Sequence, residues 1–153
     1  MQLPRYLDST SRRNFVVLPI GLLLVESLLA RGWPEINLAG LILLPWGYLQ
    51  YRLAGLYRRR RGGGGPGMAV PPERLVTTGI YALTRNPMYL GHLIFIAGLA
   101  ISLRSWIAFA VLVAYLPWFH ARVRRDEARL RDLFGTEYER YAQRVKRWIP
   151  FII

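Results

Sequence analysis

Polar side chains and a proline crowd together immediately before one apolar stretch of this chain. The segment Gly79–Gly91 reads GIYALTRNPMYLG. Asn86 is a favourable N-cap, and Pro87 suits the first helical turn because its missing N–H would have no partner there. Such a helix start presents free N–H groups and the positive end of the helix dipole, which together can bind an anion. The simpler alternative is a capped helix with Arg85 as an anchor.

A second group of charged side chains follows the last apolar stretch of the chain. It consists of Arg122, Asp126 and Glu127. Arg122 and Asp126 are four residues apart and share a helix face, so the simplest interpretation is a surface ion pair of little energetic value.

Several kinds of chemistry are excluded by composition. The chain has no cysteine and only two histidines, so we expect no disulfide, no thiolate nucleophile and no metal site. The glycine run Gly62–Gly65 follows no strand and precedes no Gly-Lys-Ser/Thr, so it predicts a flexible linker and not a phosphate-binding loop.

The elements that position these residues are predicted to be membrane helices. Apolar residues make up 53% of the chain although its net charge is +12. Apolar and basic residues are segregated along the chain, and the apolar stretches are 15–30, 36–49, 88–103 and 106–119. A 16-residue helix covers about 24 Å, and interfacial Trp, Tyr and Arg can extend it toward the roughly 30 Å of a bilayer core. We predict transmembrane helices at about 15–32, 36–56, 87–103 and 105–121.

The basic residues predict the orientation. All Lys and Arg except Arg31 and Arg104 lie before the first apolar stretch, between the second and third, or after the fourth. Positive residues stay inside, so we expect both termini and the central loop in the cytoplasm. The N-terminus lacks the features of a cleavable signal. Abundant Arg and Gly hint at a GC-rich bacterial genome, hence a bacterial inner membrane.

Residues 122–153 are predicted to form a cytoplasmic cap of two helical pieces. The first piece stops at Gly135, a good helix terminator. Thr136 and Glu139 have capping-box spacing and start the second piece, which Pro150 ends. The apolar faces of the two pieces are Leu130, Leu133 and Phe134, and then Tyr138, Tyr141 and Val145.

The two groups together resemble the isoprenylcysteine carboxyl methyltransferases and the related phospholipid N-methyltransferases. The first block of the family, G-x-Y…R-H-P-x-Y-x-G, is matched by Gly79, Tyr81, Arg85, Pro87, Tyr89 and Gly91. The second block is matched by Asp126, Glu127, Leu130, Phe134, Gly135, Glu137, Tyr138, Tyr141, Val145 and Pro150. The resemblance covers about half the chain, from Glu73 to Pro150. This sequence differs from the family pattern at one position, where Asn86 replaces the family's His.

The resemblance implies an all-α, single-domain membrane enzyme over residues 1–153 that uses S-adenosylmethionine without a Rossmann sheet. It implies cofactor contacts from Leu75, Val76, Tyr81, Arg85, Asn86, Pro87, Met88, Tyr89 and Asp126. Arg122 matches a substrate-side arginine. The acceptor would be lipid or another lipophilic molecule carrying a carboxylate, amine or thiol, and an amine would need a base such as Glu127 or His92. No nucleic-acid partner is expected.

Two other functions compete with this one. Membrane sterol reductases look distantly similar in their C-terminal helices but use a nicotinamide cofactor, and a small adaptor could bind anionic lipid without catalysis. Two residues also have open roles. Glu26 lies inside the first predicted span, where an acid is a functional candidate, although pairing with Arg31 or snorkelling is favoured. His92 either borders the site or is a hydrogen-bonded core histidine.

Overall fold

The computed structural model of this chain describes residues 9–64 and 70–149, and within these ranges every regular element is a helix. This confirms the predicted all-α class for the described residues. Expectations that concern residues 1–8, Gly65 and Pro150 lie outside them.

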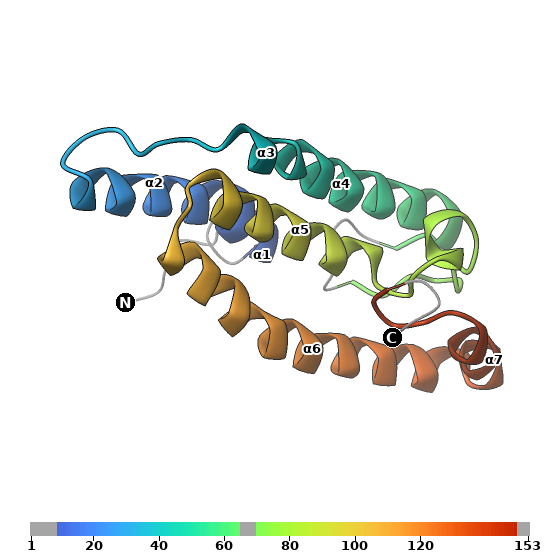
Figure 1. The fold of residues 1–153 in the computed structure, drawn as a ribbon. Helices are drawn as coiled ribbons and strands as arrows, with labels where there is room; N and C mark the ends of the chain where they lie inside the picture. Colours follow the sequence, from blue (N-terminus) through green and yellow to red (C-terminus); the bar gives the residue numbers. More distant parts are fainter. Residues whose placement is uncertain (1–8, 65–69, 150–153) are drawn as a thin grey trace. The chain divides into compact units, whose positions relative to one another are not determined.

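The helices follow the predicted apolar stretches, with different ends (Figure 1). The elements in chain order are α1 (Thr10–Arg12), the π-helix η2 (Arg13–Val17), α2 (Leu18–Leu29), α3 (Leu38–Leu41), α4 (Leu43–Gly62), the 3-10 helix η3 (Gly79–Ala82), α5 (Pro87–Ser102), α6 (Trp106–Phe134) and α7 (Thr136–Arg144). They fall into two compact units. Unit 1 comprises Met1–Tyr48 and His92–Leu116, and unit 2 comprises Leu49–Gly91 and Pro117–Ile153.

One described helix, α6, is long and apolar enough to cross a membrane when judged by length and composition alone, and α5 is a shorter apolar helix. The described part of the first predicted span is divided between η2 and α2, and the second between α3 and α4. The four predicted spans therefore stay a prediction.

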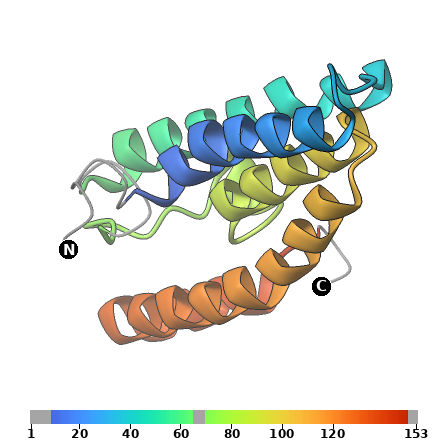
Figure 2. The ribbon, with the colours of Figure 1, turned by 90° about the vertical axis from the view of Figure 1, so that its left-hand side faces the viewer.

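The core of unit 1 lies between α2 and the second half of α5 (Figure 2). Leu22 from α2 packs with Phe95 and Leu99 from α5 and with Leu103, which follows α5. The absence of a side chain at Gly98 permits a second close contact, between α5 and the start of α4, because a Cβ there would lie 2.9 Å from Leu43 Cβ.

The π-helix buries an asparagine. Asn14 is fully buried, and its amide lies 3.3 Å from His92 Nδ1. The ring of Phe15 stacks on the same histidine, with 4.5 Å between ring centroids. These contacts favour the second interpretation of His92, a hydrogen-bonded core histidine.

Glu26 has a partner that differs from the one expected. The hydroxyl of Ser105, which precedes α6, donates a hydrogen bond to the Glu26 carboxylate and accepts one from the N–H of Ala108 at 2.9 Å. A helix-capping serine 79 residues away is thus one partner of the Glu26 carboxylate, and the favoured pairing with Arg31 or snorkelling stays a prediction.

The glycine run is more ordered than the predicted linker. The Gly62 carbonyl accepts hydrogen bonds from the N–H groups of Glu73 and Arg74, at 2.7 and 2.9 Å. A Cβ at Gly62 would lie 2.7 Å from a methyl group of Val76. The described part of the run therefore packs closely against the loop that follows it, and the linker interpretation is wrong there.

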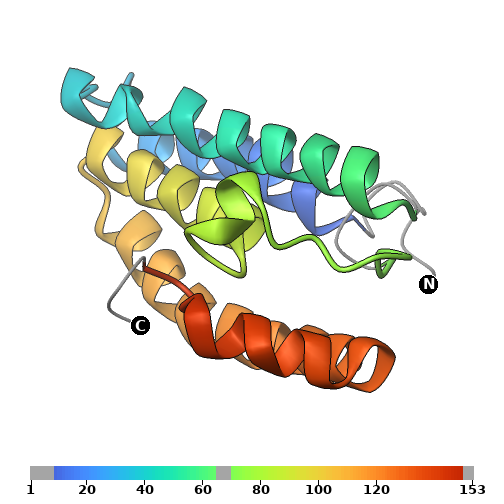
Figure 3. The same ribbon diagram turned by 90° about the vertical axis from the view of Figure 1, so that its right-hand side faces the viewer.

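The C-terminal helices begin and end differently from the prediction. The first predicted piece is continuous with the fourth apolar stretch, since α6 runs unbroken to Phe134. Gly135, with φ near +50°, then separates α6 from α7, which lies beside the end of α6 (Figure 3). The capping box is wrong because Thr136 is already helical and no side chain caps α7, and α7 ends at Arg144, before Pro150.

Candidate active site

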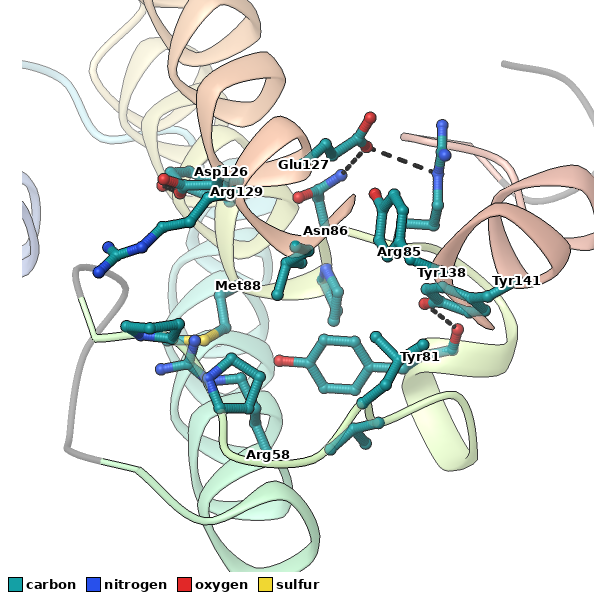
Figure 4. Close-up of a pocket in the computed structure, with 17 residues that line it drawn as sticks. Arg58, Tyr81, Arg85, Asn86, Met88, Asp126, Glu127, Arg129, Tyr138 and Tyr141 are labelled. Carbon is teal, nitrogen blue, oxygen red and sulfur yellow. Dashed lines mark hydrogen bonds and ion pairs between the residues drawn. The ribbon is translucent and has the colours of Figure 1, made fainter. Parts of the chain in front are cut away.

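A partly open cavity lies within unit 2 (Figure 4). The space inside it is about 760 Å³, a volume that includes open solvent. Its walls come from α4, the loop before η3, the start of α5, the second half of α6, and α7. The lining residues are Arg58, Pro71, Pro72, Leu75, Val76, Tyr81, Arg85, Asn86, Pro87, Met88, Tyr89, Asp126, Glu127, Arg129, Leu130, Tyr138 and Tyr141.

The first wall is the turn before α5. Gly79 has φ +61°, a conformation that favours glycine, and a Cβ there would lie 2.7 Å from the ring of Tyr57. The turn places Tyr81 in the core, where its hydroxyl lies 3.4 Å from the Ala54 carbonyl. Burial raises the pKa of Tyr81 to about 12, so this side chain is a neutral part of the wall.

The second wall joins the start of α5 to α6 through Tyr89. The Tyr89 hydroxyl donates a hydrogen bond to the Asp126 carboxylate. It accepts one from Nε of Arg122 at 3.0 Å. The guanidinium of Arg122 also lies 5.7 Å from the ring centroid of Trp118. Arg122 and Asp126, which were expected to form a surface ion pair, are therefore linked by a tyrosine that hydrogen-bonds to both side chains.

The third wall contains a buried ionic cluster around Glu127. The Glu127 side chain is only 4% exposed. Its Oε2 accepts two hydrogen bonds from the Arg147 guanidinium, at 2.8 and 3.1 Å. Its Oε1 accepts one from the Asn86 amide at 3.0 Å and lies 3.5 Å from Arg85 Nε. The bonds to Glu127 raise the pKa of the Arg147 guanidinium, which stays charged.

Three hydrogen bonds join the segment after α7 to the turn before α5. The Arg147 carbonyl accepts from Thr84 Oγ1 at 3.1 Å and from the Asn86 amide at 3.3 Å. The N–H of Arg85 donates to the Lys146 carbonyl at 3.0 Å. Within the same wall, the Tyr141 hydroxyl donates to the Tyr81 carbonyl at 2.7 Å. The C-terminal segment and the polar block of the first wall thus form one connected structure.

The structure brings most of the predicted site residues to this cavity. Those that line it are Leu75, Val76, Tyr81, Arg85, Asn86, Pro87, Met88, Tyr89, Asp126 and Glu127. Arg122 does not line the cavity and reaches it only through Tyr89. Asn86 precedes α5 as expected of an N-cap, yet its amide binds Glu127 and the C-terminal segment.

Sequence reasoning missed several lining residues. They are Arg58, Pro71, Pro72, Arg129, Leu130, Tyr138 and Tyr141. Leu130, Tyr138 and Tyr141 carried a signal, because they belong to the second sequence block and to the predicted apolar faces of the C-terminal helices. The two prolines carried none, since only the folding of the central loop brings them to the cavity.

The residues present fit a cofactor with both charged and apolar parts. Asp126 offers a carboxylate suited to an ammonium group or a ribose hydroxyl, and the aromatic and aliphatic side chains suit a flat ring. In residues 9–64 and 70–149, no group of three or more His, Cys, Asp and Glu side chains could hold a metal ion.

Comparison with known proteins places this site in a family context. Residues 65–137 match the model of the phospholipid methyltransferase family. Over 83 residues the chain is 42% identical to protein-S-isoprenylcysteine O-methyltransferase B of Arabidopsis thaliana, an alignment covering 52% of this chain and 41% of the relative. It is 38% identical over 80 residues to protein-S-isoprenylcysteine O-methyltransferase of Schizosaccharomyces pombe, covering 51% and 34%. The matched segment therefore spans less than half the length of either relative.

A solved structure shares the fold. It is the structure of a eukaryotic intramembrane Ras methyltransferase, isoprenylcysteine carboxyl methyltransferase, with a TM-score of 0.66 and 23% identity over 95% of this chain and 54% of that chain. The resemblance predicted from the two sequence blocks is confirmed over about half of the chain by sequence, and the helical fold extends further.

Proposed function

We propose that this chain is an S-adenosylmethionine-dependent methyltransferase whose active site is the cavity of unit 2. One observation carries the proposal: two sequence blocks that are far apart in the chain line the same cavity. The first block includes the start of α5, and the second lies in the second half of α6 and in α7. Tyr89 from the first block hydrogen-bonds to Asp126 from the second.

The chain's own residues would bind the cofactor and orient it. Asp126 would bind its ammonium group or ribose, while Leu75, Val76 and Met88 would contact its apolar parts. When bound, the cofactor supplies a methyl group on a sulfonium sulfur. Since this transfer is an in-line displacement, the protein mainly positions two reactants and excludes water.

The contacts of the two acids favour one class of acceptor. Glu127 already accepts hydrogen bonds on both carboxylate oxygens, and Asp126 accepts one from Tyr89. A general base needs an oxygen within reach of the substrate proton, so Glu127 is not well placed to deprotonate an amine, and the free oxygen of Asp126 is the one assigned to the cofactor. A carboxylate acceptor needs no base, only a cation to orient it, and the candidate is Arg122, which is joined to the cavity wall by its hydrogen bond to Tyr89. The relatives' printed name describes transfer to oxygen, which agrees with a carboxylate.

This assignment changes the role proposed for Glu127. Its catalytic use as a base is the weaker proposal, because buried ion pairs hold the carboxylate in the fold. We assign Glu127 to positioning Asn86 and the C-terminal segment.

We further propose that the chain forms one integral membrane domain with four spans, in a bacterial inner membrane, with both termini and residues 122–153 on the cytoplasmic side. The support is the exposure of large apolar side chains along the predicted spans, such as Leu28 at 78% and Trp106 at 83%. Acyl chains would cover such a surface. A lipophilic acceptor could then reach the cavity sideways from the bilayer.

Calorimetry on the detergent-solubilised chain tests the cofactor. We expect binding of S-adenosylhomocysteine and none of the reduced nicotinamide cofactor. Binding of the nicotinamide alone would favour a reductase, and binding of neither would favour an adaptor. A radiolabelled-methyl assay on total membrane lipid extract, with prenylcysteine and phosphatidylethanolamine as separate acceptors, would identify the product.

A further inference from the structure

The wall of the cavity contains a buried tyrosine, Tyr138, whose hydroxyl has no hydrogen-bond partner that the described residues account for. Tyr138 is 1% exposed, and its hydroxyl is buried without a hydrogen-bond partner among the residues that the structure describes. Buried tyrosine hydroxyls usually have a partner, and a buried polar group left without one destabilises the fold. The side chain lines the cavity.

The neighbouring tyrosine of α7 shows what a purely structural role looks like. Tyr141 lies on the same helix and lines the same cavity (Figure 4), and its hydroxyl donates to the Tyr81 carbonyl at 2.7 Å. The two rings pack edge to face with 6.0 Å between centroids. In the part of the chain that the structure describes, contacts therefore use both the ring and the hydroxyl of Tyr141, but only the ring of Tyr138.

The ring of Tyr138 is accounted for by packing. It belongs to the cluster that joins α7 to α6, with Leu130 and Phe134, and the Arg131 guanidinium lies 5.8 Å from its centroid. A phenylalanine would make these contacts equally well. Among the described residues, these contacts use the ring and leave the hydroxyl available to a ligand.

The chemical state of the hydroxyl suits a ligand contact. Burial, with a smaller contribution from Glu127, raises the pKa of Tyr138 to about 12. The group therefore stays protonated at neutral pH and can donate its proton to a nitrogen or oxygen acceptor.

We propose that the Tyr138 hydroxyl hydrogen-bonds directly to the cofactor bound in the cavity, which makes α7 a part of the cofactor site. This inference rests on the proposed function, because the ligand is taken to be S-adenosylmethionine or its product. The hydroxyl would satisfy its hydrogen bond only when the cofactor is present.

The test compares Tyr138→Phe with Tyr141→Phe in the full chain in detergent. S-adenosylhomocysteine is the probe, its affinity is measured by calorimetry, and unfolding temperature is measured with and without it. We expect Tyr138→Phe to weaken binding about threefold to tenfold, as for loss of one hydrogen bond, while the ligand-free unfolding temperature stays the same or rises. Tyr141→Phe should lower the ligand-free unfolding temperature, because it leaves the Tyr81 carbonyl without its donor.

Two results would overturn the inference. One is wild-type affinity in Tyr138→Phe, which would mean that the hydroxyl does not reach the ligand. The other is a ligand-free destabilisation of Tyr138→Phe equal to that of Tyr141→Phe, which would mean that the hydroxyl serves the fold. Failure of the wild-type chain to bind S-adenosylhomocysteine is a separate outcome that refutes the proposed function itself.

Discussion

Replacement of Glu127 by Gln separates a positioning role from a general-base role. The amide keeps the shape and one acceptor oxygen of the side chain but removes the negative charge that Arg147 and Arg85 face at 2.8 and 3.5 Å. Removing one partner of a buried ion pair costs about 3–5 kcal/mol. Because the Arg147 side chain is 30% exposed and can be rehydrated, we expect the lower part of this range or less, about 2–3 kcal/mol.

The expected readout is a loss of thermal stability together with a loss of cofactor affinity. For a chain of this length, each kcal/mol lowers the unfolding temperature by about 2–4 °C, so Glu127→Gln should unfold roughly 4–12 °C lower. Cofactor affinity should fall as well, since Asn86 loses the carboxylate that holds its amide. Asp132→Asn, an exposed acid on the same helix, is the matched control and should shift the unfolding temperature by no more than about 1–2 °C.

Tryptophan fluorescence in detergent follows unfolding, and calorimetry with S-adenosylhomocysteine follows binding. The positioning argument fails if Glu127→Gln unfolds and binds like wild type while methyl transfer falls about a hundredfold or more, because that pattern belongs to a general base.

Three further changes test other parts of the structure. Asp126→Asn should weaken S-adenosylhomocysteine binding about tenfold while the protein still folds, as expected when a charged hydrogen bond to a ligand loses its charge; calorimetry would contradict this if affinity were unchanged. Gly62→Ala should destabilise the chain by about 1–3 kcal/mol, because its Cβ would lie 2.8 Å from a backbone carbonyl of the following loop, whereas Gly21→Ala meets nothing within 4 Å and should leave stability unchanged or raised. Burial raises the pKa of Tyr81 and Tyr138 to about 12, above the value near 10 of an unfolded chain, so the stability that this provides is complete below about pH 10 and is lost as the pH rises toward 12; fluorescence at a series of alkaline pH values should show unfolding in this window, and a flat profile would refute it.

The sequence predicted those helix boundaries that are set by the backbone preference of a single residue. Pro87 begins α5 and Gly135 follows the last residue of α6, as their backbone preferences require. The division between the fourth span and the cap was predicted from a change of composition near residue 121. A helix needs no change of backbone conformation where its side chains turn from apolar to charged, so α6 continues for 29 residues.

The candidate site was predictable where its residues are close in sequence. The block around Asn86 and the pair Asp126 and Glu127 were found because each has a recognisable local pattern. Arg58 could not be assigned, since only the return of the loop after α4 brings it to the cavity. The hydrogen bond from Ser105 to Glu26 spans 79 residues and was equally beyond local reasoning.

The asparagine that replaces the family's histidine illustrates how a substitution in a motif should be interpreted. A change at the centre of a binding block suggests a change of substrate. In this chain, however, the Asn86 amide donates to Glu127 at 3.0 Å and to the Arg147 carbonyl at 3.3 Å, so its NH₂ group is used within the fold. An amide has two N–H donors on one atom and can hold a carboxylate and a carbonyl together, whereas an imidazole directs its donors from opposite sides of a ring. The residue at this position therefore helps to determine how the C-terminal segment is held against the cavity, so the change from His to Asn is explained by contacts within the fold.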